Sequence, residues 1–245
     1  LITKADANAK TVYIHRISFD KKTKKAIINS ELKEINDGIH EDKKVGGIVS
    51  KWQRILTENI KKIIDNPNEI IYNANPGLDG RDTPIRSEQT NLGILITKSM
   101  SYSFDNEVDC ALVNGGSIRI DDVLLGDITP VDIFRVLPYG GAVLKVQLKG
   151  RLLKRVLDYG VLAAGTGAYL QRFNAEKVND IWMINNTQID IQKTYTVAFS
   201  DYLLKGFDIP FLSEENKEVI SIYEPKPDEL AFDIRKAVVA FLKNQ

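Results

Sequence analysis

Residues 111–158 read ALVNGGSIRIDDVLLGDITPVDIFRVLPYGGAVLKVQLKGRLLKRVLD, and they carry most of the information on fold and function. This stretch opens inside a short apolar run, residues 108–113, that stops at Asn114 and two glycines. Such a run predicts a buried strand, and bare glycine backbone behind it permits close approach of a ligand. Asn114 and Arg119 flank the glycines, so we predict a recognition loop at the end of this strand.

The rest of the stretch alternates between helix and strand signals. Thr129, Pro130 and Asp132 have the order of a helix start, with an N-cap, a first-turn proline and an acidic residue at N3. Pro138 and the two glycines after Tyr139 end that helix. Residues 142–148 predict a strand, and a second helix follows from residue 150.

Outward from this stretch, the remaining elements are predicted by periodicity. Residues 11–18 and 26–32 alternate polar and apolar side chains around a polar turn, which is typical of a hairpin, and residues 45–64 carry an apolar stripe at helical spacing. Residues 73–86 are rich in Gly, Pro, Asn and Asp and predict an exposed loop before a helix. Strands are expected at 194–199 and 219–223, and a last helix is expected to be capped by Asp228.

Composition bounds the possible functions. The chain has 245 residues, with 33 basic and 33 acidic side chains, so no net field favours a nucleic-acid polymer as partner. No apolar run approaches twenty residues, so we expect no transmembrane segment. The chain starts with Leu rather than Met, which suggests a mature or truncated product. Cys110 lies in the apolar strand run and is interpreted as a core residue.

The histidines exclude one kind of site. A dinuclear hydrolase centre needs several His and Asp ligands around two ions. The chain has only His15, expected in a strand, and His40, in a polar stretch. We therefore predict no metal ligands and no catalytic residues in this chain.

Three motifs in order, NGGxIR, ITPxDIFRVLPYGG and VxLKGRLLKxVLD, closely resemble the C-terminal domain of the 5′-nucleotidase family. The resemblance implies an α/β (α+β) fold, a mixed-sheet 5′-nucleotidase C-terminal domain with flanking helices, preceded by a β-hairpin remnant and a connecting helix. It implies three parts: residues 1–40 as the remnant of a metallophosphatase domain, 41–68 as the connecting helix and 69–245 as the substrate-binding domain.

The resemblance also implies roles for particular residues. Asn114 faces the base, Gly116 permits close backbone approach, and Arg119 reaches toward ribose and phosphate. Tyr139 matches the first of two aromatic residues that sandwich the base. Arg86 matches an arginine near the substrate phosphates, and a planar guanidinium suits phosphate oxygens because it donates two parallel hydrogen bonds.

Three segments depart from the family pattern, and in one of them, residues 167–174, a glycine is missing and Arg172 introduces charge. Ser117 stands where the family usually has a third glycine, and the segment after the 194–199 strand retains Gly206 and Asp208 but not the other glycines. The second aromatic of the sandwich is therefore expected to be Phe207 or Phe211. Asp208 is carried over as a substrate-binding residue.

The function implied by the resemblance is the nucleotide-recognition part of a metal-dependent 5′-nucleotidase, an enzyme when intact. Two divalent metal ions would sit in an N-terminal metallophosphatase domain whose ligands precede Leu1, so this chain alone is expected to be inactive. Two alternatives stay open: a metallophosphatase acting on cyclic nucleotides or nucleotide sugars, and a non-catalytic nucleotide-binding domain. A periplasmic, secreted or cell-surface location is implied by the resemblance alone.

Overall fold

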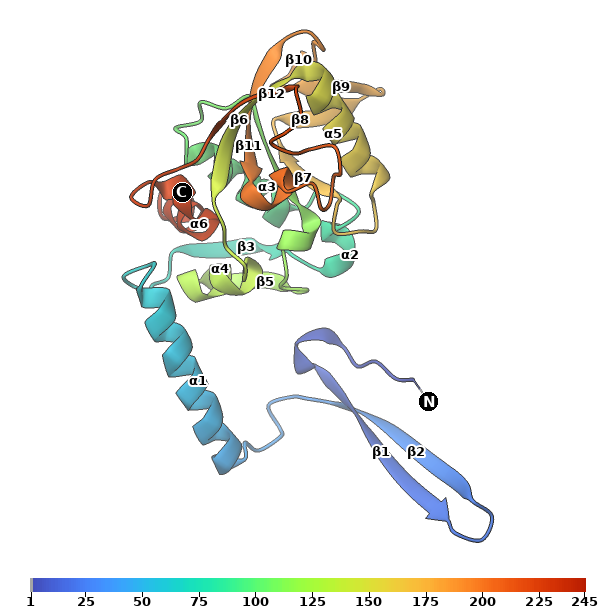
Figure 1. The fold of residues 1–245 in the computed structure, drawn as a ribbon. Helices are drawn as coiled ribbons and strands as arrows, with labels where there is room; N and C mark the ends of the chain where they lie inside the picture. Colours follow the sequence, from blue (N-terminus) through green and yellow to red (C-terminus); the bar gives the residue numbers. More distant parts are fainter. Residues whose placement is uncertain (1) are drawn as a thin grey trace. The chain divides into compact units, whose positions relative to one another are not determined.

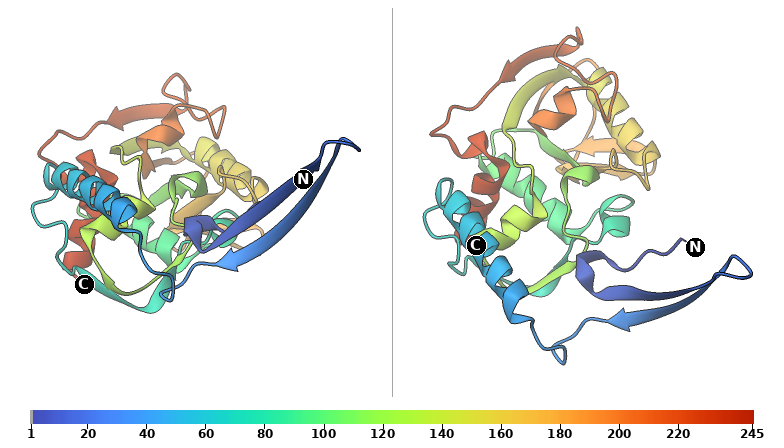
Figure 2. Two further views of the ribbon diagram at one scale, coloured as in Figure 1. Left: turned by 90° about the horizontal axis from the view of Figure 1, so that it is seen from below. Right: turned by 60° about the horizontal axis from the view of Figure 1, so that its bottom comes forward.

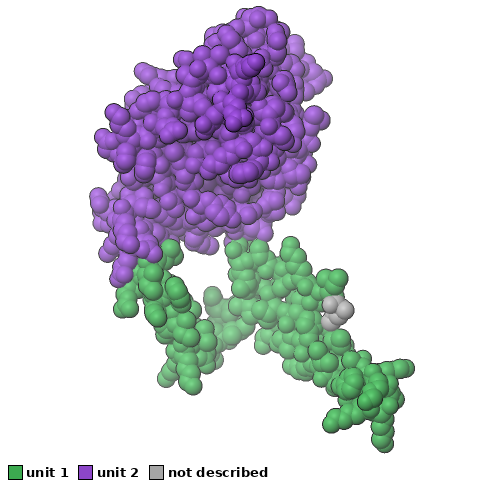
Figure 3. Space-filling model, in the orientation of Figure 1, with its two compact units in different colours: residues 1–56 green, residues 57–245 purple. Residues whose placement is uncertain are grey.

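The computed structural model describes residues 2–245. By its internal contacts the chain divides into two compact units, residues 1–56 and 57–245, which Figure 3 draws in different colours. Helix α1 (Lys43–Lys61) crosses the boundary between them in sequence. The sequence predicted a helix over residues 45–64, so α1 begins two residues earlier and ends three residues earlier than predicted.

The first unit is built on one hairpin. Strands β1 (Thr11–Asp20) and β2 (Lys25–Glu34) pair antiparallel from Thr11 opposite Glu34 to Asp20 opposite Lys25, which confirms the predicted hairpin. A single-turn 3-10 helix, η1 (Ala7–Ala9), precedes it. His15 sits in β1, where its Nδ1 lies 2.9 Å from the Ser30 hydroxyl and its Nε2 lies 3.1 Å from the Thr3 hydroxyl.

The second unit is organised around a five-stranded mixed sheet of order β12-β6-β11-β4-β7. Strands β4 and β11 are parallel, and the other neighbours are antiparallel. The mixed α/β class predicted from the sequence is confirmed. The strands of this sheet are β4 (Cys110–Asn114), β6 (Val143–Lys149), β7 (Leu170–Phe173), β11 (Thr194–Ser200) and β12 (Val219–Tyr223).

Helices cover both faces of the sheet (Figures 1 and 2). Helices α3 (Asn91–Tyr102) and α6 (Ile234–Lys243) pack together on one face, and α5 (Gly150–Leu162) packs on the other. Successive side chains of β4 point to opposite faces of the sheet, which explains why the core has two halves. Ala111 and Val113 point into the α3–α6 half, whereas Cys110 and Leu112 point into the α5 half, and all four are fully buried.

Smaller elements complete this unit. Strands β3 (Tyr72–Asp79) and β5 (Val123–Ile128) form an antiparallel pair, and a three-stranded sheet has the order β10-β9-β8. The remaining elements are α2 (Asp82–Ile85), η2 (Gly115–Ser117), α4 (Pro130–Val136), β8 (Ala175–Val178), β9 (Ile181–Ile184), β10 (Thr187–Gln188), η3 (Asp201–Leu204) and η4 (Leu230–Phe232).

The predicted start and stop of α4 are confirmed. Thr129 and Asp132 form a reciprocal capping box, in which the Asp132 carboxylate accepts from the Thr129 backbone N–H at 3.0 Å. After α4 the chain reverses through Gly140 and Gly141, whose φ angles are 62° and 99°. A Cβ atom on Gly141 would lie 2.6 Å from a carboxylate oxygen of Asp201. Glycine is required there because it brings the segment after Tyr139 against the end of β11.

Two sequence predictions are wrong. Residues 73–86 are not a loop, because β3 occupies the first half of them and α2 most of the second half. Strand β3 pairs with β5 on both sides of an irregularity between Ala74 and Leu78. The Pro-Gly pair at 76–77 lies inside that irregularity, so turn-forming residues mark a bulge rather than a loop. The cap of α6 is Asp233, which accepts from the Arg235 backbone N–H at 2.9 Å, and not Asp228.

Candidate functional site

The site starts from the one parallel pair in the sheet. In this pair Cys110 lies opposite Val197, and Leu112 opposite Phe199. Because the two strands run in the same direction, their carboxyl ends meet at one edge, which is where open α/β sheets bind ligands. Asn114 ends β4 at this edge, and Ser200 ends β11.

A cleft of about 500 Å³ opens at this edge. Clefts of comparable volume lie elsewhere on the second unit, so chemistry rather than size distinguishes this one. Its wall contains most of the side chains singled out from the sequence, namely Arg86, Asn114, Gly116, Arg119, Tyr139 and Asp208. The structure therefore brings together residues more than a hundred positions apart in the chain.

A hydrogen-bonded chain crosses one wall of the cleft. The Asn114 amide Nδ2 donates to Asp208 Oδ2 at 2.8 Å, and the Ser117 hydroxyl donates to Asn114 Oδ1 at 2.6 Å. The Tyr202 hydroxyl donates to the other Asp208 oxygen at 3.3 Å. Asn114 is 2% exposed, so these partners satisfy a buried amide that would otherwise be costly.

Arg119 and Tyr139 meet on the wall of the same cleft. An Arg119 Nη2 proton is donated to the Tyr139 hydroxyl at 3.2 Å, and the guanidinium lies 5.6 Å from the Tyr139 ring centroid. Hydrogen bonding to this phenol raises the pKa of Arg119 above its ordinary value. Tyr139 remains 72% exposed, so its ring is available for stacking.

Arg86 is positioned by its backbone and by Asp82. Its carbonyl accepts from the Gly165 N–H at 2.7 Å. Its Nε lies 2.8 Å from Asp82 Oδ1, but this buried nitrogen makes no hydrogen bond, so the contact is an ion pair in which the N–H does not aim at the oxygen. The guanidinium is thus held at the cleft by charge and not by a bidentate bond.

The glycines of the recognition loop are required by close backbone packing. The Gly116 N–H donates to the Gly167 carbonyl at 2.9 Å, and an added Cβ on Gly116 would lie 3.2 Å from two backbone atoms of Gly167. An added Cβ on Gly115 would lie 2.6 Å from the Ile85 carbonyl oxygen. Any side chain at position 115 would therefore displace the backbone that precedes Arg86.

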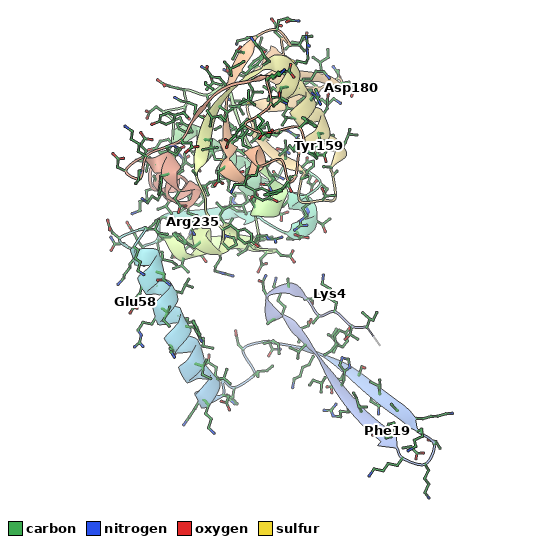
Figure 4. The ribbon with its side chains drawn as sticks, in the orientation of Figure 1. Lys4, Phe19, Glu58, Tyr159, Asp180 and Arg235 are labelled. Atoms are coloured by element: carbon green, nitrogen blue, oxygen red, sulfur yellow. The ribbon has the colours of Figure 1, made fainter. Side chains whose placement is uncertain are left out.

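The second aromatic residue at the cleft is Tyr202, which the sequence analysis missed. Tyr202 lines the cleft, whereas Phe207 and Phe211 do not. Phe207 is 72% exposed, and its ring lies 5.9 Å from that of Tyr202. Phe211 packs edge-on against Tyr159 of α5, labelled in Figure 4, at 5.6 Å between ring centroids, and under the Arg155 guanidinium at 4.4 Å.

The sequence profile described as "5′-nucleotidase, C-terminal domain" matches residues 70–214, more than half of the chain. The chain belongs to the family of 5′-nucleotidase C-terminal domains. Curated relatives agree: it is 31% identical to mouse 5′-nucleotidase over 204 residues, covering 71% of this chain and 34% of that protein. It is 33% identical to human 5′-nucleotidase over 159 residues, covering 60% of this chain and 26% of that protein.

The fold agrees with a solved member. The crystal structure of a 5′-nucleotidase precursor from Thermus thermophilus superposes with a TM-score of 0.70 at 20% identity, covering 96% of this chain and 47% of that one. The chain therefore spans less than half the length of these relatives, over their C-terminal portion.

Three further findings concern metal ligands, membrane-spanning helices and the cysteine of this chain. Within residues 2–245, no group of three His, Cys, Asp or Glu side chains is arranged to hold a metal ion. Nor does any helix of the described part have the length and apolar character needed to cross a membrane. Cys110 is fully buried, and burial raises the pKa of its thiol.

Proposed function

We propose that this chain is the nucleotide-recognition part of a metal-dependent 5′-nucleotidase, with residues 69–245 as the substrate-binding domain. The observation that carries the proposal is the convergence of Tyr139, Tyr202 and two arginines on one cleft at the sheet edge. An aromatic ring can stack on the base of a nucleotide, and a guanidinium group can bind its phosphate. The cleft therefore carries groups that suit both parts of a nucleotide.

In this proposal each group has one task. Tyr139 and Tyr202 stack on the base, and Asn114 contacts its edge with the donor and acceptor capacity that its partners leave free. Arg119 contacts ribose and phosphate, and Arg86 contacts phosphate. Asp208 accepts a hydrogen bond from the ligand, and Gly116 lets the loop approach it closely.

The phosphoester chemistry is assigned to another part of the intact protein. The family relationship supports two divalent metal ions in a metallophosphatase domain, to which residues 1–40 would belong and to which residues 41–68 would connect. Those ions would supply hydroxide and stabilise the leaving oxygen. The side chains of this chain would bind and orient the nucleotide, and they would do so in a periplasmic, secreted or cell-surface enzyme.

The division of labour is tested by incubating this chain with AMP, a cyclic nucleotide or a nucleotide sugar, each with Mg²⁺, Mn²⁺ or Zn²⁺, and separating substrate from products by chromatography. No hydrolysis above the buffer blank is expected for any of them. Hydrolysis of AMP that follows the concentration of the chain would overturn the assignment of catalysis to another domain.

A further inference from the structure

Ser117 follows the two glycines of the recognition loop, and it lines the cleft. Its hydroxyl lies 2.6 Å from the amide oxygen of Asn114. What this hydroxyl offers a ligand depends on where its single proton lies, and the neighbouring groups determine that.

The orientation of the Asn114 amide follows from Asp208. A carboxylate only accepts hydrogen bonds, and Asp208 Oδ2 lies 2.8 Å from the amide. The atom facing it must therefore be Nδ2, because an amide oxygen at that distance would bring two acceptors together. The opposite atom, Oδ1, then faces Ser117 and also only accepts, so the serine proton is committed to Oδ1.

Ser117 donates to Asn114, Asn114 donates to Asp208, and Tyr202 donates to Asp208. The protons that make these three hydrogen bonds are therefore used within the wall. The Ser117 oxygen keeps lone pairs and no proton for the cleft. Ser117 is only half-buried, so a ligand in the cleft can reach that oxygen.

We propose that the Ser117 hydroxyl oxygen accepts a hydrogen bond from the bound ligand and selects nucleosides that carry a donor at that position. The donor is an exocyclic amino group of the base or a hydroxyl of the sugar. This inference rests on the proposed function, because it takes the ligand of the cleft to be a nucleoside or nucleotide.

The test is a calorimetric titration of the whole chain with nucleosides that differ by one donor. Purine riboside is compared with adenosine and with 2-aminopurine riboside, which add an amino group at different ring positions. Adenosine is compared with 2′-deoxyadenosine and 3′-deoxyadenosine, which each lack one sugar hydroxyl. The proteins are wild type, Ser117→Ala, Ser117→Thr and Ser221→Ala.

Ser221→Ala is the matched control, because the Ser221 hydroxyl also donates to an amide oxygen, that of Gln147 at 3.1 Å, but lies on β12 outside the cleft wall. Wild type and Ser221→Ala should prefer one donor-bearing ligand over its donor-free counterpart by about three- to tenfold. Ser117→Ala should lose that preference while binding the donor-free ligand as wild type does, and Ser117→Thr, which keeps the hydroxyl, should retain it.

The outcomes separate the two claims. Loss of the amino preference identifies the base as the donor, and loss of the hydroxyl preference identifies the sugar. If Ser117→Ala leaves every preference unchanged, or weakens all ligands equally by merely loosening Asn114, the inference is overturned and the proposed function stands. If wild type binds none of the nucleosides, the proposed function fails and the inference fails with it.

Discussion

At the scale of single residues, the cleft depends on two tyrosines from distant segments, Tyr139 after α4 and Tyr202 after β11. Stacking of an aromatic ring on a nucleobase contributes about 1–3 kcal/mol. We expect Tyr139→Ala and Tyr202→Ala each to weaken AMP binding by about five- to a hundredfold, measured by calorimetry.

Phe211→Ala is the control for this prediction, since Phe211 packs on α5 and not on the cleft. It should lower the melting temperature and leave the affinity for AMP unchanged. A loss of affinity in Phe211→Ala as large as that in Tyr202→Ala would show that the sandwich has been assigned to the wrong ring.

The titration of the Tyr202 phenol also tests the hydrogen bond between Tyr202 and Asp208. Burial and the neighbouring Asp208 carboxylate raise the pKa of Tyr202 above its ordinary value. The folded protein therefore favours the neutral phenol over the phenolate. The contribution of Tyr202 to the free energy of unfolding is fully present below the ordinary pKa of tyrosine, about 10, and is lost as the pH rises through the raised pKa. The difference in phenolate absorbance between wild type and Tyr202→Phe should therefore develop above pH 10.

Asp208→Asn supplies the comparison, because it removes the charge next to the phenol. The Tyr202 titration should move to lower pH in this variant. A titration of Tyr202 below the ordinary value in wild type would contradict the hydrogen bond to Asp208.

The turns that carry Asn114, Arg119 and Tyr139 were predictable, because glycines and a proline mark them in the sequence. The structure places the three residues on one cleft, and their roles stay predictions that rest on the family resemblance.

Tyr202 was missed because only Phe207 and Phe211 were considered as the second ring, and the sequence does not show which residue after 194–199 faces the cleft. The structure supplies the missing information: β11 runs parallel to β4, so the first aromatic residue after β11, Tyr202, lies near Asn114.

At the scale of elements, the capping of α6 distinguishes the structure from the sequence prediction. Asp233 caps α6 and pairs with the Arg235 guanidinium at 2.6 Å, with both side chains largely buried. Asp233→Ala removes the cap and leaves a buried cation unpaired, so we expect a loss of about 2–4 kcal/mol in the free energy of unfolding. Denaturant titration measures it.

The exposed Asp228, which the sequence had suggested as the cap, is the matched control. Asp228→Ala should change the free energy of unfolding by less than about 0.5 kcal/mol. Equal losses in the two variants would mean that the α6 cap has been misplaced.

The glycine loop is the second element that can be tested. A methyl group on Gly115 would collide with the Ile85 carbonyl oxygen at 2.6 Å, so Gly115→Ala should cost about 1–3 kcal/mol and weaken AMP binding. Gly47→Ala, in α1 with no atom within 4 Å of the added Cβ, should not destabilise the chain. Unchanged stability in Gly115→Ala would contradict the close packing of this loop on α2.

Elements with a local signal were predicted and those without one were not. The α4 capping box and the polar–apolar alternation of β1 and β2 both depend on residues that are close together in the sequence, so both were predicted. Strand β3 was missed because its pairing partner β5 is remote in sequence and its Pro-Gly pair imitates a loop. Local propensity cannot report a bulge that exists only because another strand lies alongside.

At the scale of the whole molecule, the two units differ in how they are stabilised. The second unit encloses two hydrophobic clusters on opposite faces of one sheet. The first unit is built on a two-stranded hairpin in which every residue of β2 is exposed, and isolated hairpins are marginally stable. Hydrogen exchange should therefore protect the amides of β4 strongly and those of β1 and β2 weakly.

That comparison needs no variant, because each unit is the reference for the other. Protection of the hairpin amides as strong as that of β4 would contradict the marginal stability expected of the β1–β2 hairpin.

In the proposed function, the cleft between the ends of β4 and β11 binds a nucleotide without cleaving it. Calorimetric titration of the whole chain with AMP in EDTA tests this proposal. We predict saturable binding with one AMP per chain, lost in the Tyr139→Ala/Tyr202→Ala double variant, and AMP recovered intact afterwards. Absence of saturable binding, or binding that the double variant retains in full, would contradict the account.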